Sequence, residues 1–559
     1  MRRQLCRNVR VAGAGSPRHH DAGRPQEDAL SDDVTREATR RRTFAVISHP
    51  DAGKSTLTEA LALHAHAIAQ AGAVHGKGSR RGVVSDWNEM EQARGISITS
   101  AALQFRVQDV VINLLDTPGH ADFSEDTYRV LSAVDCAVML LDAAKGLEPQ
   151  TLKLFEACRA RATPVITVIN KWDRPGQEPL ALLDEISDRL GIQPTPLNWP
   201  VGIAGDFRGV TDVETGGMTE FTRTPGGATI AARESLTAAE AAERHGVDWE
   251  RATEEFELLA ASGQTHDQAE FLAARTTPVL FAAAVQNFGV AELLEAVIEL
   301  APPPSAWTDT KQQPRPVEAP FSGFIFKVQT GMDPAHRDRM AFMRVCSGRF
   351  ERGAVLTQAR TGRPFQTKYA QSVFGRERET IDEAYPGDVV GLTNAQALQV
   401  GDTLYDSRAV TFPGLPRFAP EHFAVFRPRD TGRAKQFRRG IELLDQEGVV
   451  QVLVSDRRGV QAPVLAAVGP MQFEVAAHRL EHEFGAPASQ DRLAYGVASR
   501  VTPEAAPVVD RERGAEVLER TDGVVVALFA DTWRMHAIAG RLPSGSLPPI
   551  FAVDDEVGA

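Results

Sequence analysis

The segment at 48–56, S-H-P-D-A-G-K-S-T, carries the residue types that proteins use to hold the phosphates of a nucleotide. It follows an apolar run at 43–47, which is typical of a short buried strand, and it precedes a helix-like pattern that starts at Leu57. Gly53 lets the backbone turn close to the phosphates, and the exposed N–H groups and the N-terminus of the helix favour the anion. The segment therefore predicts a phosphate-binding loop between a strand and a helix.

Two side chains at the end of this loop would act directly on the nucleotide. Lys54 would reach the β- and γ-phosphates, and the Ser55 hydroxyl would bind Mg²⁺. The strict phosphate-loop pattern has glycine where this chain has Ser48. Taken alone, the motif therefore leaves an ordinary strand-to-helix turn as the alternative.

A second apolar strand, at 110–116, ends in an acid and then enters a flexible turn. Asp116 is placed to hold Mg²⁺ through water, and the N–H of Gly119 would meet a γ-phosphate. Between this strand and the first loop lies R-G-I-S-I-T at 94–99. There Ser97 offers a hydroxyl to Mg²⁺ only when a γ-phosphate holds the segment in place.

A third apolar strand, at 164–169, runs into N-K-W-D at 170–173. The Asp173 carboxylate can accept two hydrogen bonds from guanine N1 and N2, and adenine would leave this buried acceptor unpaired. Asn170 would tie this loop to the phosphate loop, and the stem of Lys171 would lie along the base. Four such motifs in this order, each at the end of a strand, predict a guanine nucleotide site rather than an ordinary turn.

These motifs resemble those of the translational GTPases. The resemblance rests on S-H-P-D-A-G-K, R-G-I-S-I-T-S, D-T-P-G-H-A-D-F-S-E-D-T-Y-R and N-K-W-D. Longer stretches at 85–97, 332–348 and 445–452 are similar to the release factor 3 family within that group. The likeness begins near residue 40, covers most of the chain and fades towards the C-terminus.

The resemblance implies a Mg²⁺-dependent GTPase that is stimulated by the ribosome. Its expected partners are ribosomal RNA and proteins, together with class I peptide release factors, which the GTP form would drive off the ribosome after peptide release. We expect a monomer in the cytoplasm with no membrane contact. A factor of the elongation factor G or ribosome-protection type is the alternative, but those chains carry further C-terminal domains for which little sequence remains here.

The resemblance also implies a role for individual residues. His120 would orient the water that attacks the γ-phosphate, while Pro50 and Ile96 hold it away until a partner moves it into place. Because phosphoryl transfer depends on positioning and charge neutralisation more than on covalent chemistry, the loop and Mg²⁺ would supply most of the rate. Arg94 is either an arginine finger or a structural brace of its segment.

The expected site residues fall into three sets. The catalytic set is His120, Lys54 and Asp51. The metal set is Ser55, Ser97 and Asp116, the last acting through water. The set that binds GTP or GDP is Ser48, His49, Pro50, Asp51, Ala52, Gly53, Lys54, Ser55, Thr56, Asp116, Gly119, His120, Asn170, Lys171, Asp173, Ala283 and Ala284.

One departure from the family lies in the loop expected to touch the base. Where the family has a short Gly-Thr/Ser-Ala sequence, this chain has F-A-A-A-V at 281–285. Ala282 and Ala283 lose the flexible or hydroxyl-bearing positions, although the backbone N–H of Ala284 would still meet guanine O6. We expect the affinity to change and the identity of the base to stay the same.

Two other classes of protein share part of this pattern. A kinase or ATPase with a phosphate loop would need Lys54 and Ser55 but not the N-K-W-D segment. A nucleotide-gated binding module with negligible hydrolysis would keep the pocket and could dispense with His120. A basic cluster either contacts ribosomal RNA or forms a solvated helix face. The cluster comprises Arg433, Lys435, Arg438 and Arg439.

Composition sets broader limits. A chain of 559 residues implies several domains, and its 43% hydrophobic and 24% charged residues are ordinary for a globular protein. No apolar stretch approaches the roughly 18 residues needed to cross a bilayer. The net charge of −13 argues against broad coating of nucleic acid, although local patches decide contact. The four cysteines show no C-x-x-C spacing, and we expect Cys136 and Cys158 to be buried thiols in a reducing compartment.

Shifts in composition divide the chain. Residues 1–38 have no apolar h-region and no helical period, which predicts a disordered tail rather than a secretory signal, with a basic targeting segment as the alternative. Alternating strands and helices predict an α/β GTP-binding domain at 39–305 with a mostly parallel sheet and a helical insertion at 234–274. After a proline-rich linker, short strands predict an antiparallel β-barrel at 306–415. Mixed patterns predict an α/β C-terminal domain at 416–559.

Overall fold

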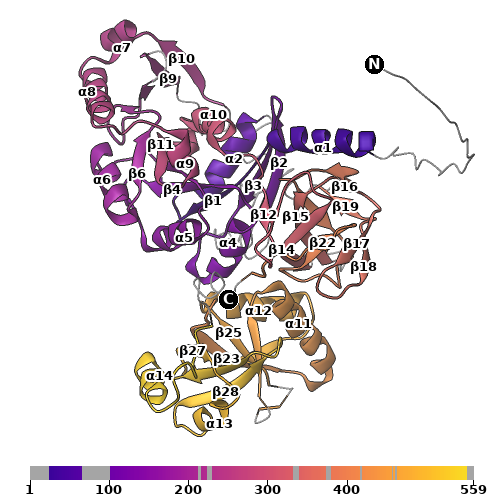
Figure 1. The fold of residues 1–559 in the computed structure, drawn as a ribbon. Coiled ribbons are helices and arrows are strands. Elements are labelled where there is room, and N and C mark those ends of the chain that lie inside the picture. Colours follow the sequence, from indigo (N-terminus) through magenta and orange to yellow (C-terminus); the bar gives the residue numbers. More distant parts are fainter. Residues whose placement is uncertain are drawn as a thin grey trace, which may run out of the picture.

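Three seven-stranded sheets follow one another along the part of the chain that the structure describes (Figure 1). This computed structural model describes residues 24–65, 101–211, 216–222, 230–330, 339–372, 379–415, 418–455, 458–459 and 462–550. The first sheet, the second sheet and the third sheet define the first, second and third domains. Figure 1 shows the first two domains side by side and the third domain below them.

The sheet of the first domain is parallel except at one edge, where β2 runs antiparallel to β3. This confirms the mostly parallel sheet predicted for the domain. In spatial order its strands are β2 Ala101–Val107, β3 Val110–Asp116, β1 Arg41–Ser48, β4 Cys136–Asp142, β5 Val165–Asn170, β11 Thr276–Phe281 and β6 Gln193–Pro196.

Helices cover both faces of this sheet, so its strands are apolar on both sides. On β1, Ala45 and Ile47 pack in one buried cluster, and Phe44 and Val46 pack in another on the opposite face. The first cluster is covered by α4 Ser124–Leu131, α5 Pro149–Ala160 and α6 Pro179–Leu190. The second is covered by α2 Lys54–His64 and α10 Val290–Leu300.

The predicted insertion at 234–274 is helical apart from the strand at its start. A small antiparallel sheet, in the order β10-β9-β8-β7, leads into it. The strands are β7 Pro200–Val201, β8 Gly209–Thr211, β9 Met218–Thr222 and β10 Ala232–Leu236, and the helices are α7 Ala238–His245, α8 Val247–Ala261 and α9 Gln268–Leu272. Thr237 and Glu240 form a reciprocal capping box at the start of α7, which fixes where that helix begins.

The prediction of a disordered tail is wrong from residue 24 onward, because Arg24–Thr39 forms helix α1. Val34 and Ala38, four residues apart, are buried on one side of this helix. Two small apolar contacts are enough to dock a helix that ionic contacts also hold, and so weak a stripe is hard to see in a polar sequence. Residues 1–23 lie outside the described part of the chain.

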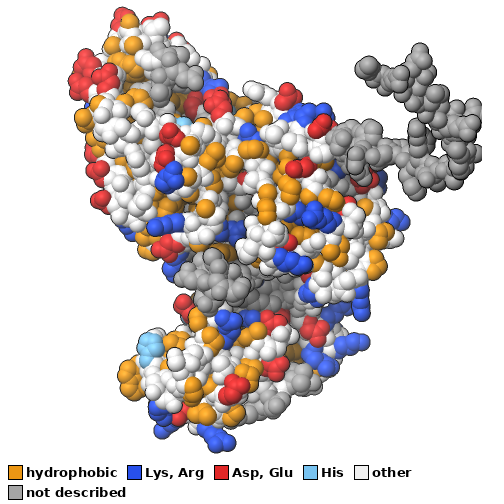
Figure 2. Space-filling model, in the orientation of Figure 1, with side chains coloured by type: hydrophobic (Ala, Val, Ile, Leu, Met, Phe, Trp, Pro, Cys, Tyr) orange, Lys and Arg blue, Asp and Glu red, His pale blue; other side chains and the backbone are white. Residues whose placement is uncertain are grey.

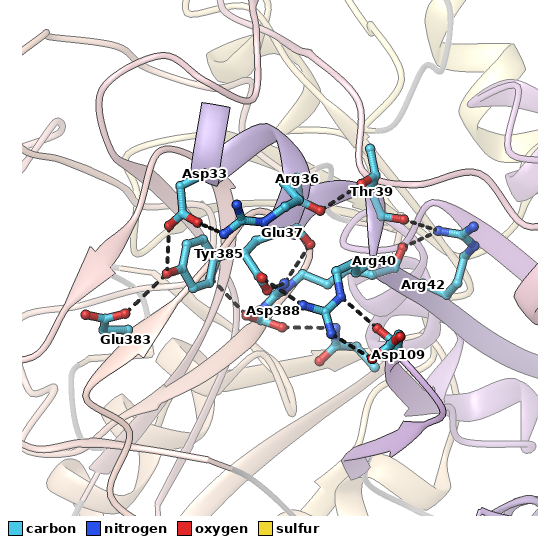
Figure 3. A network of polar contacts seen from close by, with 12 residues as sticks. Asp33, Arg36, Glu37, Thr39, Arg40, Arg42, Asp109, Glu383, Tyr385 and Asp388 are labelled. Carbon is cyan, nitrogen blue, oxygen red and sulfur yellow. Dashed lines mark hydrogen bonds and ion pairs between the residues drawn. The ribbon is translucent and has the colours of Figure 1, made fainter. Parts of the chain in front are cut away.

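A polar network fastens α1 to the second domain (Figure 3). Arg41 donates from Nε to Asp388 Oδ2 at 2.8 Å and pairs with Glu37 of α1 at 2.8 Å. The Tyr385 hydroxyl lies 3.4 Å from Asp33 Oδ2, and the Arg41 guanidinium lies 4.8 Å from the centre of the Tyr385 ring. The helix therefore bridges two domains rather than extending freely.

The second domain is an antiparallel sheet that curls on itself, as predicted for a barrel-like domain (Figure 1). In spatial order its strands are β18 Pro364–Gln366, β17 Val355–Gln358, β22 Thr403–Tyr405, β14 Ser322–Thr330, β15 Arg339–Ser347, β21 Val389–Leu392 and β19 Ala370–Gln371. Two short pairs accompany it, β12 Trp307–Thr308 with β13 Pro314–Arg315, and β16 Phe350–Glu351 with β20 Glu383–Ala384.

The third domain combines an antiparallel sheet with helices on one of its faces. Helices α11 Ala434–Glu447 and α12 Met471–His482 pack on one half of this face, and α13 Ala506–Val509 and α14 Thr532–Ala539 pack on the other half, beside β29. The strands in spatial order are β26 Ala488–Arg492, β23 His422–Pro428, β25 Val464–Ala467, β24 Gln451–Val454, β28 Ala515–Arg520, β29 Val525–Phe529 and β27 Val497–Arg500.

Buried ion pairs join the domains. Arg344 on β15 reaches across to Asp135, just before β4, with 2.6 Å between Nη2 and Oδ2, and it also donates to the Ala133 carbonyl at 3.3 Å. The Arg344 side chain is 1% exposed, so both charges are largely removed from water. Such a pair adds little net free energy when it is intact, but removing one partner leaves a buried charge without compensation.

Glu447, at the C-terminal end of α11, joins all three domains. Its Oε2 lies 2.6 Å from Arg479 of α12, and its Oε1 accepts a hydrogen bond from the backbone N–H of Thr330 at 3.1 Å. Its backbone carbonyl accepts from Arg129 of α4 at 3.1 Å. One residue of the third domain therefore contacts the end of β14 in the second domain and a helix of the first.

The surface mixes both signs of charge. On the face drawn in Figure 2, Lys and Arg lie scattered among Asp and Glu. Within the described ranges, none of the helices combines the length and hydropathy that a membrane crossing requires. Cys136 and Cys158 are fully buried, as predicted, and burial raises the pKa of the Cys158 thiol to about 12.

We predict that Arg344→Met lowers the free energy of unfolding by about 3–5 kcal/mol, because it leaves the Asp135 carboxylate buried without its partner. The matched control is Arg352→Met in the same domain, whose ion pair with Asp382 is exposed to water. We expect that control to change the free energy by less than about 1 kcal/mol. Urea unfolding of both variants measures the difference, and equal midpoints would contradict the role given to Arg344.

Candidate functional site

The phosphate loop lies between the end of β1 at Ser48 and the start of α2 at Lys54. Its backbone is in the left-handed region at Asp51, with φ 66°, and at Gly53, with φ 98°. A Cβ atom at Gly53 would lie 2.6 Å from Asn170 Nδ2. Glycine is therefore required at this position by its backbone conformation and by the close approach of Asn170.

Ser48 occupies the position where the strict pattern has glycine, and its side chain bonds within the loop. The Ser48 side chain is buried, and its hydroxyl donates to the carbonyl of His49 at 2.9 Å. His49 Nε2 in turn lies 3.2 Å from Oε1 of Glu148, the residue that precedes α5. The Ala52 N–H donates back to the His49 carbonyl at 3.3 Å, and this bond closes the turn.

Lys54 is buried and faces the turn that follows β3. A Cβ atom at Gly119 would lie 3.1 Å from Lys54 Nζ and 3.5 Å from Pro50 Cα. The turn is also tied to β1, because the Thr117 hydroxyl donates to the Val46 carbonyl at 2.7 Å. The structure therefore brings the phosphate loop and the glycine of the second motif together, with the lysine between them.

The expected metal ligands are oxygen donors at adjacent strand ends. Asp116 ends β3 and is 2% exposed, and the parallel register pairs it with Val46 of β1, just before the loop that carries Ser55. Among the described residues, no group of three or more His, Cys, Asp or Glu could hold a metal. A hydroxyl, one carboxylate and phosphate oxygens are a donor set that suits Mg²⁺, which is usually bound by few protein ligands. Ser97 lies outside the described residues, as do Arg94 and Ile96.

Asn170, at the end of β5, ties the phosphate loop to the loop after β11. Its Nδ2 donates to the Ala52 carbonyl at 2.9 Å, and its Oδ1 accepts from the Ala284 N–H at 3.0 Å. The side chain is almost fully buried. Both of its polar atoms are hydrogen-bonded, so the amide fixes the spacing of the two loops. The sequence predicted the bond to the phosphate loop but not the bond to the loop after β11.

Asp173 presents a buried acceptor at the same edge of the sheet. Its Oδ1 atom is shielded from water and has no hydrogen-bond partner within the described chain. A buried carboxylate oxygen in a native structure normally has a donor. A base that offers two N–H groups would supply it, so this residue fits the guanine expected from the sequence.

Lys171 forms a bridge that the sequence did not indicate. Its backbone is in the left-handed region, with φ 65°, and its Nζ lies 2.9 Å from Asp142 Oδ2 and also bonds to the Asp51 carbonyl. Burial acts to raise the pKa of the Asp142 carboxyl, but hydrogen bonds from Lys171 and from the Ala144 N–H outweigh it and hold the pKa below its usual value. Asp142 ends β4 and pairs with Asn170 at the end of β5. Its position at a strand end is the feature of the sequence from which a role at this site could have been predicted.

The Ala284 N–H, which is expected to meet guanine O6, has a partner within the chain. That N–H donates to Asn170 Oδ1, and the N–H of Ala283 donates to the Phe288 carbonyl at 3.0 Å. The amide of Asn170 reaches this loop because β5 and β11 are neighbours in the sheet. Ala283 and Ala284 therefore shape the loop through buried backbone, with both N–H groups already engaged.

His120 follows Gly119 and lies at the rim of the site, with 34% of its side chain exposed. Its Nδ1 lies 3.2 Å from Asp122 Oδ1 and 3.3 Å from the Asp122 N–H. The ring meets Phe123 edge-on, with 6.4 Å between centroids. Of the two residues expected to gate His120, Pro50 contacts the neighbouring Gly119, and Ile96 is outside the described residues.

Two groups of expected residues are exposed. The Asp51 and Thr56 side chains are exposed at the mouth of the loop. The basic cluster lies on and just before the first turns of α11, and all four of its side chains are exposed, while Phe437 of the same helix is buried. Exposure is compatible with both interpretations of the cluster, which comprises Arg433, Lys435, Arg438 and Arg439.

Three family models match consecutive parts of the chain. The model of the elongation factor Tu GTP binding domain matches residues 39–303, and that of elongation factor G domain 2 matches residues 320–407. The model of the C-terminal domain of class II release factor RF3 matches residues 412–539. The order of the matches follows the order of the three sheets.

Curated relatives are similar along almost their full length. A peptide chain release factor 3 from Acaryochloris marina is 44% identical over 94% of this chain and 99% of its own. One from Symbiobacterium thermophilum is 44% identical over 92% of this chain and 98% of its own, and one from Bordetella avium is 48% identical over 84% and 88%. A crystal structure of a protein from Thermus thermophilus is similar in fold, with a TM-score of 0.65, 22% identity, and coverage of 81% of this chain and 67% of that one.

We predict that Asp173→Asn shifts the nucleotide preference from GTP towards xanthosine triphosphate. The new amide donates a hydrogen bond where xanthine O2 accepts one, and it no longer accepts from the guanine amino group. Competition binding with the two nucleotides measures the preference. Asp188→Asn, on the exposed side of α6, is the matched control and should keep the original preference. Unchanged preference in the Asp173 variant would show that this carboxylate does not select the base.

Proposed function

The chain belongs to the peptide chain release factor 3 family, and we propose that it is a ribosome-dependent GTPase of translation termination. One observation carries this proposal. The match to the C-terminal domain of class II release factors covers residues 412–539 and lies directly after matches to a GTP-binding domain and an elongation factor G domain. A translational GTPase of another kind would not account for that third match.

The nucleotide half of the proposal rests on the geometry of the loops. We propose that GTP and GDP bind with the phosphates on residues 48–56 and the base against Asp173. Support comes from the buried Asp173 oxygen that lacks a donor and from the close packing at Gly53 and Gly119, where a Cβ atom would lie 2.6 Å from Asn170 Nδ2 and 3.1 Å from Lys54 Nζ. Lys54 lies where it would neutralise the β- and γ-phosphates.

We propose that Ser55, Asp116 and Ser97 hold Mg²⁺, with Asp116 acting through water. The ion, when bound, would neutralise charge on the β- and γ-phosphate oxygens. Lys54 adds a fixed positive charge on the other side, and backbone N–H groups at the start of α2 face the same anion. The work of the chain is therefore to position the phosphates and to balance their charge, which is what phosphoryl transfer needs.

His120 is the residue that we propose positions the attacking water. It lies directly after Gly119, where a Cβ atom would lie 3.1 Å from Lys54 Nζ, so it adjoins the part of the site where Lys54 would meet the β- and γ-phosphates. Within the described chain its Nε2 makes no hydrogen bond, which leaves that atom available to water. Asp51 and Lys54 complete the proposed catalytic set.

On the ribosome, we propose that the GTP form displaces a class I release factor after peptide release and that hydrolysis then lets this protein leave. Three domains joined by polar contacts can present one surface with GTP and another after hydrolysis. GTP must favour one of these states, since equal affinity for both would shift nothing. The exposed basic cluster on α11 is a candidate contact to ribosomal RNA.

We also propose a monomer in the cytoplasm, with domain limits at 39–305, 306–415 and 416–559. The family models change close to these limits, and the three sheets fall within them.

We predict that His120→Ala lowers ribosome-stimulated hydrolysis by about 10²–10⁴-fold, the range for loss of a group that handles the proton of an attacking water. Nucleotide affinity should stay nearly unchanged, because the ring lies beyond the base and phosphate contacts. His536→Ala, on exposed α14, is the control and should leave both quantities unaltered. Turnover on ribosomes equal to that of the unaltered protein would remove His120 from the mechanism.

A second prediction tests the cellular role. With GTP, the purified protein should accelerate dissociation of a labelled class I release factor from ribosomes that have released their peptide, and Lys54→Ala should not. Lys145→Ala, with a half-exposed side chain outside the loop, should act like the unaltered protein. If the labelled factor leaves at the same rate with and without the protein while tRNA or mRNA movement accelerates, the chain acts as a translocase and the termination role is wrong.

A further inference from the structure

Asp122 links the proposed catalytic histidine to the third domain. It lies in the short helix η1 Ala121–Phe123, two residues after His120, and is buried. One carboxylate oxygen, Oδ1, lies 3.2 Å from His120 Nδ1. The other, Oδ2, accepts a hydrogen bond of 2.7 Å from the backbone N–H of Met471 in the third domain. A single side chain thus touches both sides of the domain boundary.

The histidine is held through one ring nitrogen only. When Nδ1 carries a proton it can donate to Asp122 Oδ1, and when Nδ1 is bare it can accept from the Asp122 N–H at 3.3 Å. Either tautomer therefore finds its partner in the same residue. Nε2 makes no hydrogen bond in the part of the chain described, so the anchor orients the ring and leaves its other nitrogen for a reacting molecule.

The third domain holds Asp122 through the start of α12. Met471 is the first residue of that helix, where an N–H has no partner within the helix and a negative side chain is favoured. The chain comes very close here, because a Cβ atom at Gly469 would lie 2.0 Å from Asp122 Cγ. The position of the Asp122 carboxylate therefore depends on how the third domain is docked.

Two further contacts make this docking specific. Phe123 is buried against Val475 of α12, with Met471 beside them. Further along the chain, Arg129 of α4 donates to the Glu447 carbonyl at 3.1 Å, and a Cβ atom at Gly448 would lie 2.1 Å from its guanidinium. The whole segment from η1 through α4 is thus fixed against the ends of α11 and α12.

We propose that Asp122 is a positioning residue for GTP hydrolysis and that it transmits the docking of the third domain to the orientation of His120. This inference rests on the proposed role of His120 in hydrolysis. When the third domain is docked, Met471 holds the Asp122 carboxylate, and the carboxylate holds the imidazole through Nδ1 with Nε2 facing outward. When that contact is broken, the ring loses its fixed orientation while the nucleotide pocket keeps all of its own contacts.

Gly469→Ala tests this coupling from the third domain, outside the phosphate and base contacts. The new methyl group would displace the Asp122 carboxylate, which is a movable side chain, and Gly469 has no left-handed backbone that alanine would strain. We expect ribosome-stimulated kcat to fall by about 10–100-fold, the range typical of groups that orient a first contact residue. KM and the affinity for a fluorescent GTP analogue should not change. Gly540→Ala in the same domain, whose Cβ would have ordinary contacts, should match the unaltered protein.

A double-mutant cycle separates this coupling from a general loss of structure. In the His120→Ala background, Gly469→Ala and Asp122→Ala should cause no further loss of turnover, because the group through which they act is gone. The ¹⁵N shifts of the His120 ring should change in the Gly469 variant without nucleotide, and the unfolding midpoint should confirm that the domain is folded. The proposal is overturned if the Gly469 variant keeps full turnover, or if its loss is equally large in both backgrounds. If His120→Ala alone keeps full turnover, the failure lies in the proposed function instead.

Discussion

The two hydrogen bonds of the Asn170 amide are the interaction on which the nucleotide site depends. They join the phosphate loop after β1 to the loop after β11, from a residue that ends β5. The carboxyl ends of parallel strands meet at one edge of the sheet, so a short side chain there can reach both neighbours. Without that amide, the phosphate loop and the loop after β11 would lose the side chain that bonds to both of them. Gly53 permits this arrangement because it has no Cβ atom, which would lie 2.6 Å from Asn170 Nδ2.

The sequence predicted the structure correctly wherever a site element consists of one strand and the loop that follows it. The phosphate loop, the strand ending at Asp116 and the strand ending at Asn170 all lie as expected, because apolar runs fix the strands and glycine fixes the turns. Contacts between distant segments were missed. Helix α1 depends on the ion pair of Glu37 with Arg41 of β1 and on the hydrogen bond between Asp33 and Tyr385 of the second domain. The Ala284 N–H is bonded by an amide on a neighbouring strand. The roles of Asp142 and Asp122 depend on contacts with Lys171 and Met471, which no local sequence pattern predicts.

The first domain likewise combines local features with contacts to distant parts of the chain. Its pocket is built from its own strand ends, yet the segment that carries His120 and α4 is packed against α11 and α12. Glu447 contacts both Arg479 and the end of β14, so it fixes the second and third domains relative to each other at the same point. A change in one of these contacts therefore acts first on the segment around His120, at the rim of the nucleotide site, rather than on the phosphate loop or on the loop that carries Asp173.

The domain boundaries are lined with guanidinium and carboxylate groups, among them Arg344, Arg41 and Glu447. An apolar boundary would resist separation by about 25 cal/mol for each Å² exposed, and it would leave an adhesive face afterwards. Charged groups regain hydration when they part, which offsets much of the lost pairing. The polar groups therefore lower the cost of separating the domains, whereas the buried apolar cluster that the first and second domains share holds those two together.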